Sequence, residues 1–142
     1  KALKDCGGVD LFIGGVGEDG HIALNEPYSS LNSRTRAMLL TPSTLRANSR
    51  FFDNDIQKVP TTALTIGIET MMEAEEVLIL ASGARKALAV QHAVEGNISH
   101  VWPITALQHH QYGIIACDKD ATEQLSQETV RYFEDVEKNN FS

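Results

Sequence analysis

The sequence predicts an α/β protein with an open, mainly parallel sheet flanked by helices (Rossmann-like). Two observations carry this prediction. Three short apolar runs, at residues 9–15, 77–81 and 113–117, lack the polar alternation of a half-exposed strand and suit strands buried on both faces of a parallel sheet. Segments with helical spacing separate the runs, and this alternation of strand and helix is typical of a parallel sheet.

The first third of the chain begins with the strand expected over 9–15. Residues 17–35 are rich in Gly, Asn, Ser and Pro, which predicts an irregular loop. Residues 36–60 are ambiguous. Thr41 could cap a short helix, with Pro42 at its first position, but polar residues dominate the segment, which also fits a mobile surface flap.

The middle of the chain leads into the second buried strand. Residues 63–68 alternate with a β bias, and residues 69–76 could form a short helix. After the strand at 77–81, the segment that follows Gly83 predicts a helix closed by Gly96.

The last third predicts a short helix over 104–109 and the third strand over 113–117. Thr122 is a plausible N-cap for a final helix through about residue 137, because apolar side chains recur there near the 3.6-residue period. The expected organisation is one domain over residues 1–142, with residues 36–60 as a short helix or a mobile surface flap.

Composition excludes several functional classes. The chain has 142 residues, 42% of them hydrophobic and 22% charged, values that are ordinary for a soluble globular domain. The net charge of −7 offers no basic footprint for nucleic acid. A small anionic substrate stays possible, because it needs only a few cations in one pocket.

The two cysteines, Cys6 and Cys117, form no metal-binding or disulfide pattern. We expect both to be small buried hydrophobes in a reducing cytosol. No apolar run approaches ~18 residues, so no membrane span is expected, and no signal peptide is visible. The chain has no initiator Met and reaches a core strand at once, which suggests an internal start, so we expect an incomplete part of a longer domain.

The stretch GGVGEDGHIALNEP follows the first strand, where ligands bind in open α/β sheets. Its glycines, Gly15 and Gly17 among them, let the backbone approach a ligand. Residues 15–20 match GxGxxG in form, but Pro27 prevents a good opening helix, which argues against a dinucleotide site.

Asp19, His21 and Glu26 form a candidate acid–base cluster in this stretch. A carboxylate beside an imidazole fixes its tautomer and raises its basicity, which suits proton transfer on a carbonyl or hemiacetal. Each residue alone could equally be a turn aspartate, a satisfied histidine or a surface glutamate. Their grouping after a strand favours the catalytic interpretation.

Longer motifs resemble the glucosamine-6-phosphate deaminase (isomerase) family: DLFIGGVGEDGHIALNEPYSS, SRTR, ANSRFFDND, VPTTALTIG and VEGNISHVWPITALQHH. The related 6-phosphogluconolactonases share the Gly-x-Gly-x-Asp-Gly-His part but diverge where this chain has Asn-Glu-Pro. The resemblance implies amino-sugar catabolism in the cytoplasm, without metal or cofactor: glucosamine 6-phosphate and water give fructose 6-phosphate and ammonia. A lactonase-like hydrolase and a non-catalytic phosphosugar sensor are the alternatives.

The resemblance also implies residue roles. His21 would open the sugar ring, with Asp19 and Glu26 completing its triad. The base that moves the proton between C2 and C1 is, in the family, an aspartate of the N-terminal half, and no residue here matches it. We therefore expect residues 1–142 alone to be inactive. Arg50 and Lys86 match cations that meet the substrate phosphate, Arg50 from a lid that closes over the sugar in the family and that residues 36–60 would form. Without the resemblance, Arg50 would be interpreted as a solvated loop arginine and Lys86 as a helix lysine with its charge in solvent.

Some members of the family are hexamers activated by N-acetylglucosamine 6-phosphate at a subunit interface. Ser29, Ser30 and Arg36 match positions of that allosteric site, and Tyr132 matches a tyrosine linked to the transition. Met38 departs from the pattern, because a lysine is usual there. The resemblance thus implies a homo-oligomer with a possible activator.

Overall fold

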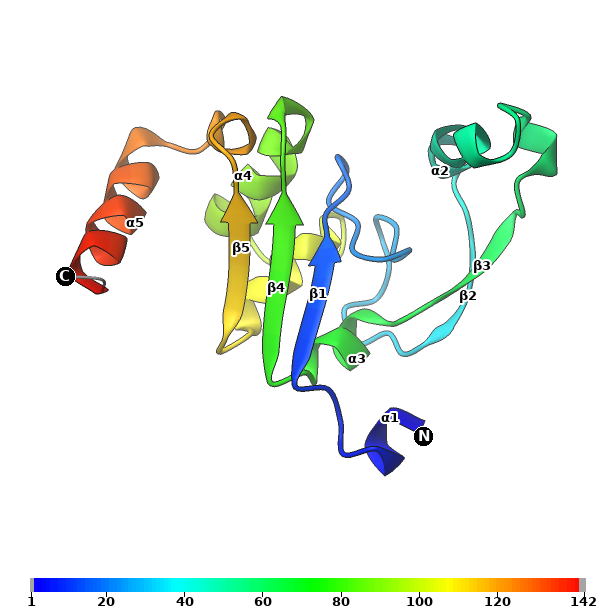
Figure 1. The fold of residues 1–142 in the computed structure, drawn as a ribbon, viewed down its shortest axis with the longest axis horizontal. Helices are drawn as coiled ribbons and strands as arrows, with labels where there is room; N and C mark the ends of the chain where they lie inside the picture. The colour runs from blue at the N-terminus through cyan, green and yellow to red at the C-terminus, as the bar shows by residue number, and fades with distance from the viewer. Residues whose placement is uncertain (1, 141–142) are drawn as a thin grey trace.

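The computed structural model describes residues 2–140 and contains a three-stranded parallel sheet. Its strands are β1 (Leu11–Gly15), β4 (Glu76–Ala81) and β5 (Gly113–Cys117), in the order β1-β4-β5. Gly15 pairs with Leu80, and Ala81 pairs with Cys117. All three strands therefore end at the same edge of the sheet (Figure 1). The predicted α/β class is confirmed.

Helices cover one face of this sheet. They are α3 (Ile68–Met72), α4 (Ala87–Glu95) and the 3-10 segment η4 (Pro103–His109). The side chains of Val77 and Ile79 point into this core and are 0% exposed. The core excludes water from that face and supports the loop that follows β1.

The opposite face of the sheet is open among the residues that the structure describes. Leu11, Ile13, Leu80 and Ile114 are each between 45% and 57% exposed. The prediction of strands buried on both faces is therefore wrong for this chain as described. A continuous apolar run indicates a strand that can be covered on both faces, but it does not specify whether both faces are covered.

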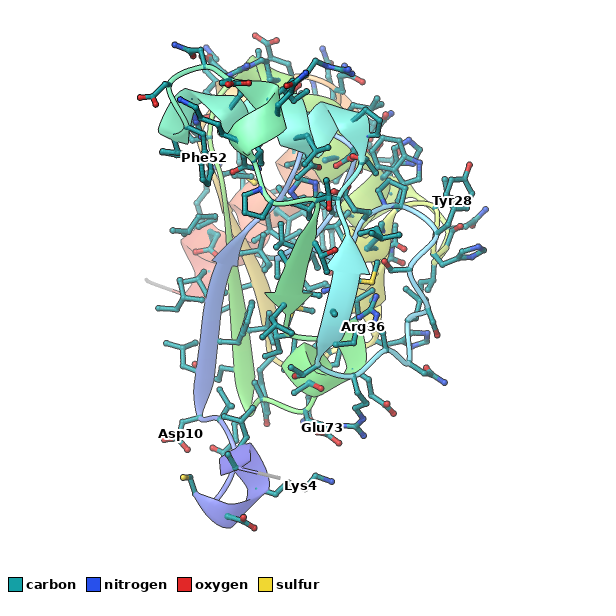
Figure 2. All side chains as sticks on the ribbon, turned by 90° about the vertical axis from the view of Figure 1, so that its right-hand side faces the viewer. Lys4, Asp10, Tyr28, Arg36, Phe52 and Glu73 are labelled. Carbon is teal, nitrogen blue, oxygen red and sulfur yellow. The ribbon has the colours of Figure 1, made fainter. Side chains whose placement is uncertain are left out.

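A two-stranded arm extends from the side of the sheet (Figure 1). It pairs β2 (Arg36–Leu39) with β3 (Thr62–Thr65) in antiparallel register. At its tip are α2 (Pro42–Asn48) and the 3-10 turns η1 (Ser49–Phe51) and η2 (Ile56–Lys58). Figure 2 shows the arm from its own side, with Arg36 at the base and Phe52 at the tip.

The start of α2 confirms the predicted cap. The backbone N–H of Thr44 donates to Thr41 Oγ1 over 3.3 Å, and Pro42 occupies the first turn. Strand β2 was not predicted, because it alternates only half-buried and exposed side chains, Arg36 and Ala37 first.

Three further predictions need correction. The helix expected over 69–76 is the shorter α3, which ends at Met72, and Glu76 already belongs to β4. The final helix, α5 (Gln127–Asn140), is capped by the Ser126 hydroxyl, which accepts from Thr129 N over 3.1 Å; Thr122 lies in the preceding turn η5 (Asp120–Thr122).

Cys6 and Cys117 are exposed and not buried. Cys6 follows the short helix α1 (Ala2–Asp5), outside the core, and Cys117 ends the exposed edge strand β5. Among the residues described, no helix is long and apolar enough to cross a membrane.

Candidate active site

The loop after β1 folds back on itself at the carboxyl edge of the sheet. Gly17 N donates to the His21 carbonyl over 2.9 Å, and Ile22, 1% exposed, anchors the loop in the core. Gly20 has φ +80°, and its carbonyl accepts from Ile104 N over 2.9 Å. This positive φ favours glycine, so the turn and its link to η4 depend on Gly20.

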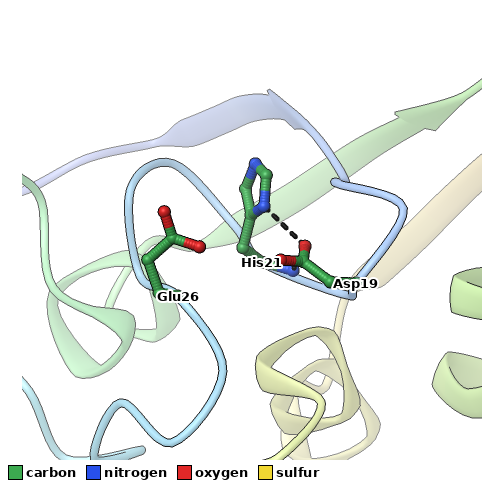
Figure 3. Close-up of side chains that lie close together, drawn as sticks. All are labelled: Asp19, His21 and Glu26. Carbon is green, nitrogen blue, oxygen red and sulfur yellow. Dashed lines mark hydrogen bonds and ion pairs between the residues drawn. The ribbon is translucent and has the colours of Figure 1, made fainter. Parts of the chain in front are cut away.

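Asp19 and His21 are in direct contact (Figure 3). Asp19 Oδ1 lies 2.6 Å from His21 Nδ1, and it also accepts from the His21 backbone N over 3.3 Å. When Nδ1 donates to Asp19, Nε2 is left as the proton acceptor. The contact therefore orients the ring and selects its tautomer.

Glu26 completes the cluster. Its side chain is buried, and one ligand atom from each of Asp19, His21 and Glu26 lies within 4.8 Å of the others. The structure thus brings together the three residues that the sequence grouped. The same spacing would also allow a metal ion to be held, because two carboxylates and an imidazole are metal ligands.

Gly15 and Gly17 play different parts in this geometry. Gly15 ends β1 and is exposed. Gly17 is buried, and a Cβ placed there would lie 2.2 Å from the His21 ring. Gly17 therefore makes room for the imidazole, a role that the sequence-based interpretation of a glycine approaching a ligand did not anticipate.

Two hydroxyls from the arm reach the buried carboxylate. The Thr44 hydroxyl donates to Glu26 Oε1, and the Thr41 hydroxyl lies 3.5 Å from the same oxygen. Glu26 Oε2 is buried and has no hydrogen-bond partner among the described residues. No sequence signal pointed to Thr44, because only the folding of the arm brings it to the loop.

Asn25 ties the loop to the base of the arm. Its Nδ2 donates to the carbonyls of Ile22 (2.9 Å) and Ile66 (2.8 Å), and its Oδ1 accepts from Arg36 over 2.9 Å. Asn25 is only 1% exposed. Arg36, which the resemblance assigns to an activator site, thus contacts the loop after β1 directly.

The other residues matched to the activator site are spread out. The Ser29 hydroxyl is buried without a hydrogen-bond partner among the described residues, whereas Ser30 is exposed. Tyr132 is 64% exposed on α5 and packs edge-on against Phe133. Figure 1 places α5 and the arm at opposite sides of the sheet, so within this chain Tyr132 is remote from Arg36.

The two predicted phosphate cations lie on different elements. Lys86 ends the 3-10 turn η3 (Ala84–Lys86), just past the carboxyl end of β4, and is half-buried. An ion pair of 3.3 Å between Arg85 and Glu18 joins this turn to the loop after β1. Arg50 is exposed on η1 at the tip of the arm, with its guanidinium 4.7 Å from the centre of the Phe51 ring.

Asp118 supports the turn that carries Lys86. Its carboxylate accepts from the Ser82 hydroxyl, from Gly83 N over 2.9 and 3.0 Å, and from Ala121 N over 2.9 Å. These bonds, that from Ser82 first, hold the pKa of Asp118 below its ordinary value. Sequence reasoning missed this residue, because an aspartate after a strand carries no motif.

We expect Asp118→Asn to lower stability at neutral pH and to lose part of its effect in acid. The folded-state pKa is lowered, so the carboxylate stabilises fully above the ordinary value of 3.8 and less as the pH falls below it. Urea unfolding across a pH series measures this. Asp10→Asn, an exposed site at the other end of the sheet, is the control; equal pH profiles for the two variants would contradict the prediction.

Comparison with known protein families gives a clear match. Residues 1–116 match the family described as glucosamine-6-phosphate isomerases/6-phosphogluconolactonase. A glucosamine-6-phosphate deaminase of Phocaeicola vulgatus is 59% identical over 140 residues, covering 99% of this chain and 53% of the relative. That of Bacteroides thetaiotaomicron is 60% identical over 137 residues, covering 96% and 51%. The chain spans about half the length of the curated relatives it matches.

Solved structures of related proteins resemble this chain in fold. A monomeric glucosamine-6-phosphate deaminase superposes with a TM-score of 0.80 at 40% identity, over 84% of this chain and 49% of that protein. The 6-phosphogluconolactonase of Trypanosoma brucei gives a TM-score of 0.60 at 22% identity, over 89% and 47%. The second likeness is one of fold alone.

Proposed function

This chain belongs to the family of glucosamine-6-phosphate isomerases and 6-phosphogluconolactonases, and from that membership we propose that the protein carrying it converts glucosamine 6-phosphate and water to fructose 6-phosphate and ammonia. The 2.6 Å contact between Asp19 and His21, with Glu26 beside it, is the observation that carries the proposal. Relatives with about 60% identity are named deaminases, whereas the lactonase likeness is one of fold.

The cluster suits opening of the sugar ring. Opening takes a proton from the anomeric hydroxyl and delivers one to the ring oxygen, and the Nε2 atom of His21 can do both in turn. Asp19 holds the ring and stabilises the imidazolium that forms. Glu26 supplies a second carboxylate that can share the proton. The later transfer from C2 to C1 needs a further carboxylate base, which we assign outside these three residues.

We assign the substrate phosphate to Lys86 and Arg50. Lys86 ends η3, which an exposed ion pair between Arg85 and Glu18 links to the loop after β1. Arg50 is at the tip of the arm, residues 36–60 of which we propose as a lid that closes over the sugar. Arginine and lysine in a closing site fit a phosphate, since both donate charged hydrogen bonds. Activation, a homo-oligomer and a cytoplasmic location stay predictions.

Ammonia release from glucosamine 6-phosphate is the deciding assay. The protein that carries this chain is expected to release ammonia, to run slowly in reverse from fructose 6-phosphate and ammonium, and to leave 6-phosphogluconolactone intact. Dialysis against a chelator is expected to change none of this. Residues 1–142 assayed alone are expected to be inactive.

Each alternative has its own outcome in this assay. Lactone hydrolysis without ammonia release would favour the hydrolase. Binding of the sugar phosphate without turnover, unchanged in His21→Asn, would favour the sensor. Loss of activity on chelation would indicate a metal requirement, for which Asp19, His21 and Glu26 are candidate ligands.

A further inference from the structure

A hydroxyl from the arm holds the buried carboxylate of the acid–base cluster. Thr44, 8% exposed on α2, donates to Oε1 of Glu26, 18 residues earlier in the chain. Oε2 of the same carboxylate is buried without a hydrogen-bond partner among residues 2–140. A buried acceptor left alone is costly, so such an atom in a candidate active site points to a donor that arrives with ligand.

The position of Thr44 is itself well determined. Thr41 caps α2 by accepting from Thr44 N, and the Thr41 hydroxyl lies 3.1 Å from Thr44 Oγ1. The Thr44 carbonyl accepts from Asn48 Nδ2 over 2.9 Å. The first turn of α2 thus fixes the position of the Thr44 hydroxyl. The Thr41 hydroxyl donates to the Thr44 hydroxyl, which donates to Glu26, and hydrogen bonds in such a chain strengthen one another.

We propose that Thr44 is a positioning residue for the proposed reaction. By engaging Oε1, it fixes the orientation of the Glu26 carboxylate and leaves Oε2 as the oxygen that can accept a further hydrogen bond in the acid–base cluster. The contact also joins two parts of the protein, because Thr44 belongs to the arm and Glu26 to the loop after β1. The position of the arm is therefore coupled to the orientation of the Glu26 carboxylate. This inference rests on the proposed function, whose lid it connects to the chemistry.

Thr44→Val tests the role, because it removes the hydroxyl and keeps the branched shape. We expect kcat for ammonia release to fall about 10- to 100-fold, because one hydrogen bond to a charged group is lost. KM is expected to change less than about threefold, since Thr44 touches Glu26 and not the phosphate cations. Thr44→Ser restores the hydroxyl and is expected to recover most of kcat.

Ser43→Ala is the matched control. Ser43 is exposed on the same turn, and its hydroxyl contacts Thr41 rather than Glu26. Equal kcat values for Thr44→Val and Ser43→Ala would overturn the proposal. So would a Thr44→Ser variant as slow as Thr44→Val, because the side chain would then act through packing alone.

A double-mutant cycle makes the test independent of turnover. Urea midpoints of Thr44→Val, Glu26→Ala and the double variant are expected to be non-additive, as for residues in contact. Additive midpoints would overturn the contact and the proposal with it. If the wild-type protein releases no ammonia, the proposed function and the positioning role of Thr44 in it both fail. Non-additive midpoints would then leave a structural contact only.

Discussion

His21→Asn is expected to lower kcat for ammonia release by about 10²- to 10⁴-fold, the contribution of a positioned acid–base group. Asparagine occupies a similar place but cannot relay a proton at Nε2. The protein should still fold, because the His21 side chain is 30% exposed and its recorded hydrogen bond is with Asp19. Initial rates and an unfolding curve for the same preparation measure both quantities.

His109→Asn is the control for this substitution. His109 is exposed on η4 and is expected to leave kcat within about twofold, as for a surface change away from the site. Binding of fructose 6-phosphate is expected to survive in both variants. Ammonia release by His21→Asn at the wild-type rate would show that another group opens the ring.

Asn25→Asp is expected to be the most damaging isosteric change to stability. Asn25 Nδ2 donates to two carbonyls, those of Ile22 and Ile66. In Asn25→Asp a carboxylate oxygen would replace this nitrogen, so an acceptor would face both carbonyl oxygens. A buried carbonyl left without its donor costs about 1–3 kcal/mol. For the two carbonyls together, the free energy of unfolding is therefore expected to fall by about 2–6 kcal/mol. The gain of charge opposite Arg36 offsets part of this, because that pair is close.

The pH dependence of Asn25→Asp follows from the same contacts. Once protonated, the new carboxyl could donate to one of the two carbonyls, so the loss of stability is expected to be largest at neutral pH and to shrink in acid. Urea unfolding at several pH values measures it. Asn32→Asp, on the exposed part of the same loop, should change stability by less than about 0.5 kcal/mol. Equal midpoints for the two variants would refute the role of Asn25.

Most of the regular structure could be predicted from the sequence. The three strands of the sheet follow from apolar runs, and α2 follows from Thr41 and Pro42 at its start. Strand β2 could not be predicted, since its side chains lack a buried face. The late start of α5 was also missed, because Thr122 and Ser126 are both residue types that cap helices.

The sequence by itself determined the local chemistry. Asp19 and His21 are two residues apart after a buried strand, so their contact needs only a short turn, and the family motif surrounds them. Only the tertiary structure decided the long-range contacts. Thr44 meets Glu26, and Arg36 meets Asn25, because the register of β2 and β3 and the fold of the arm bring them together. Periodicity reports whether a side chain is buried, but the partner it meets depends on how separate elements pack.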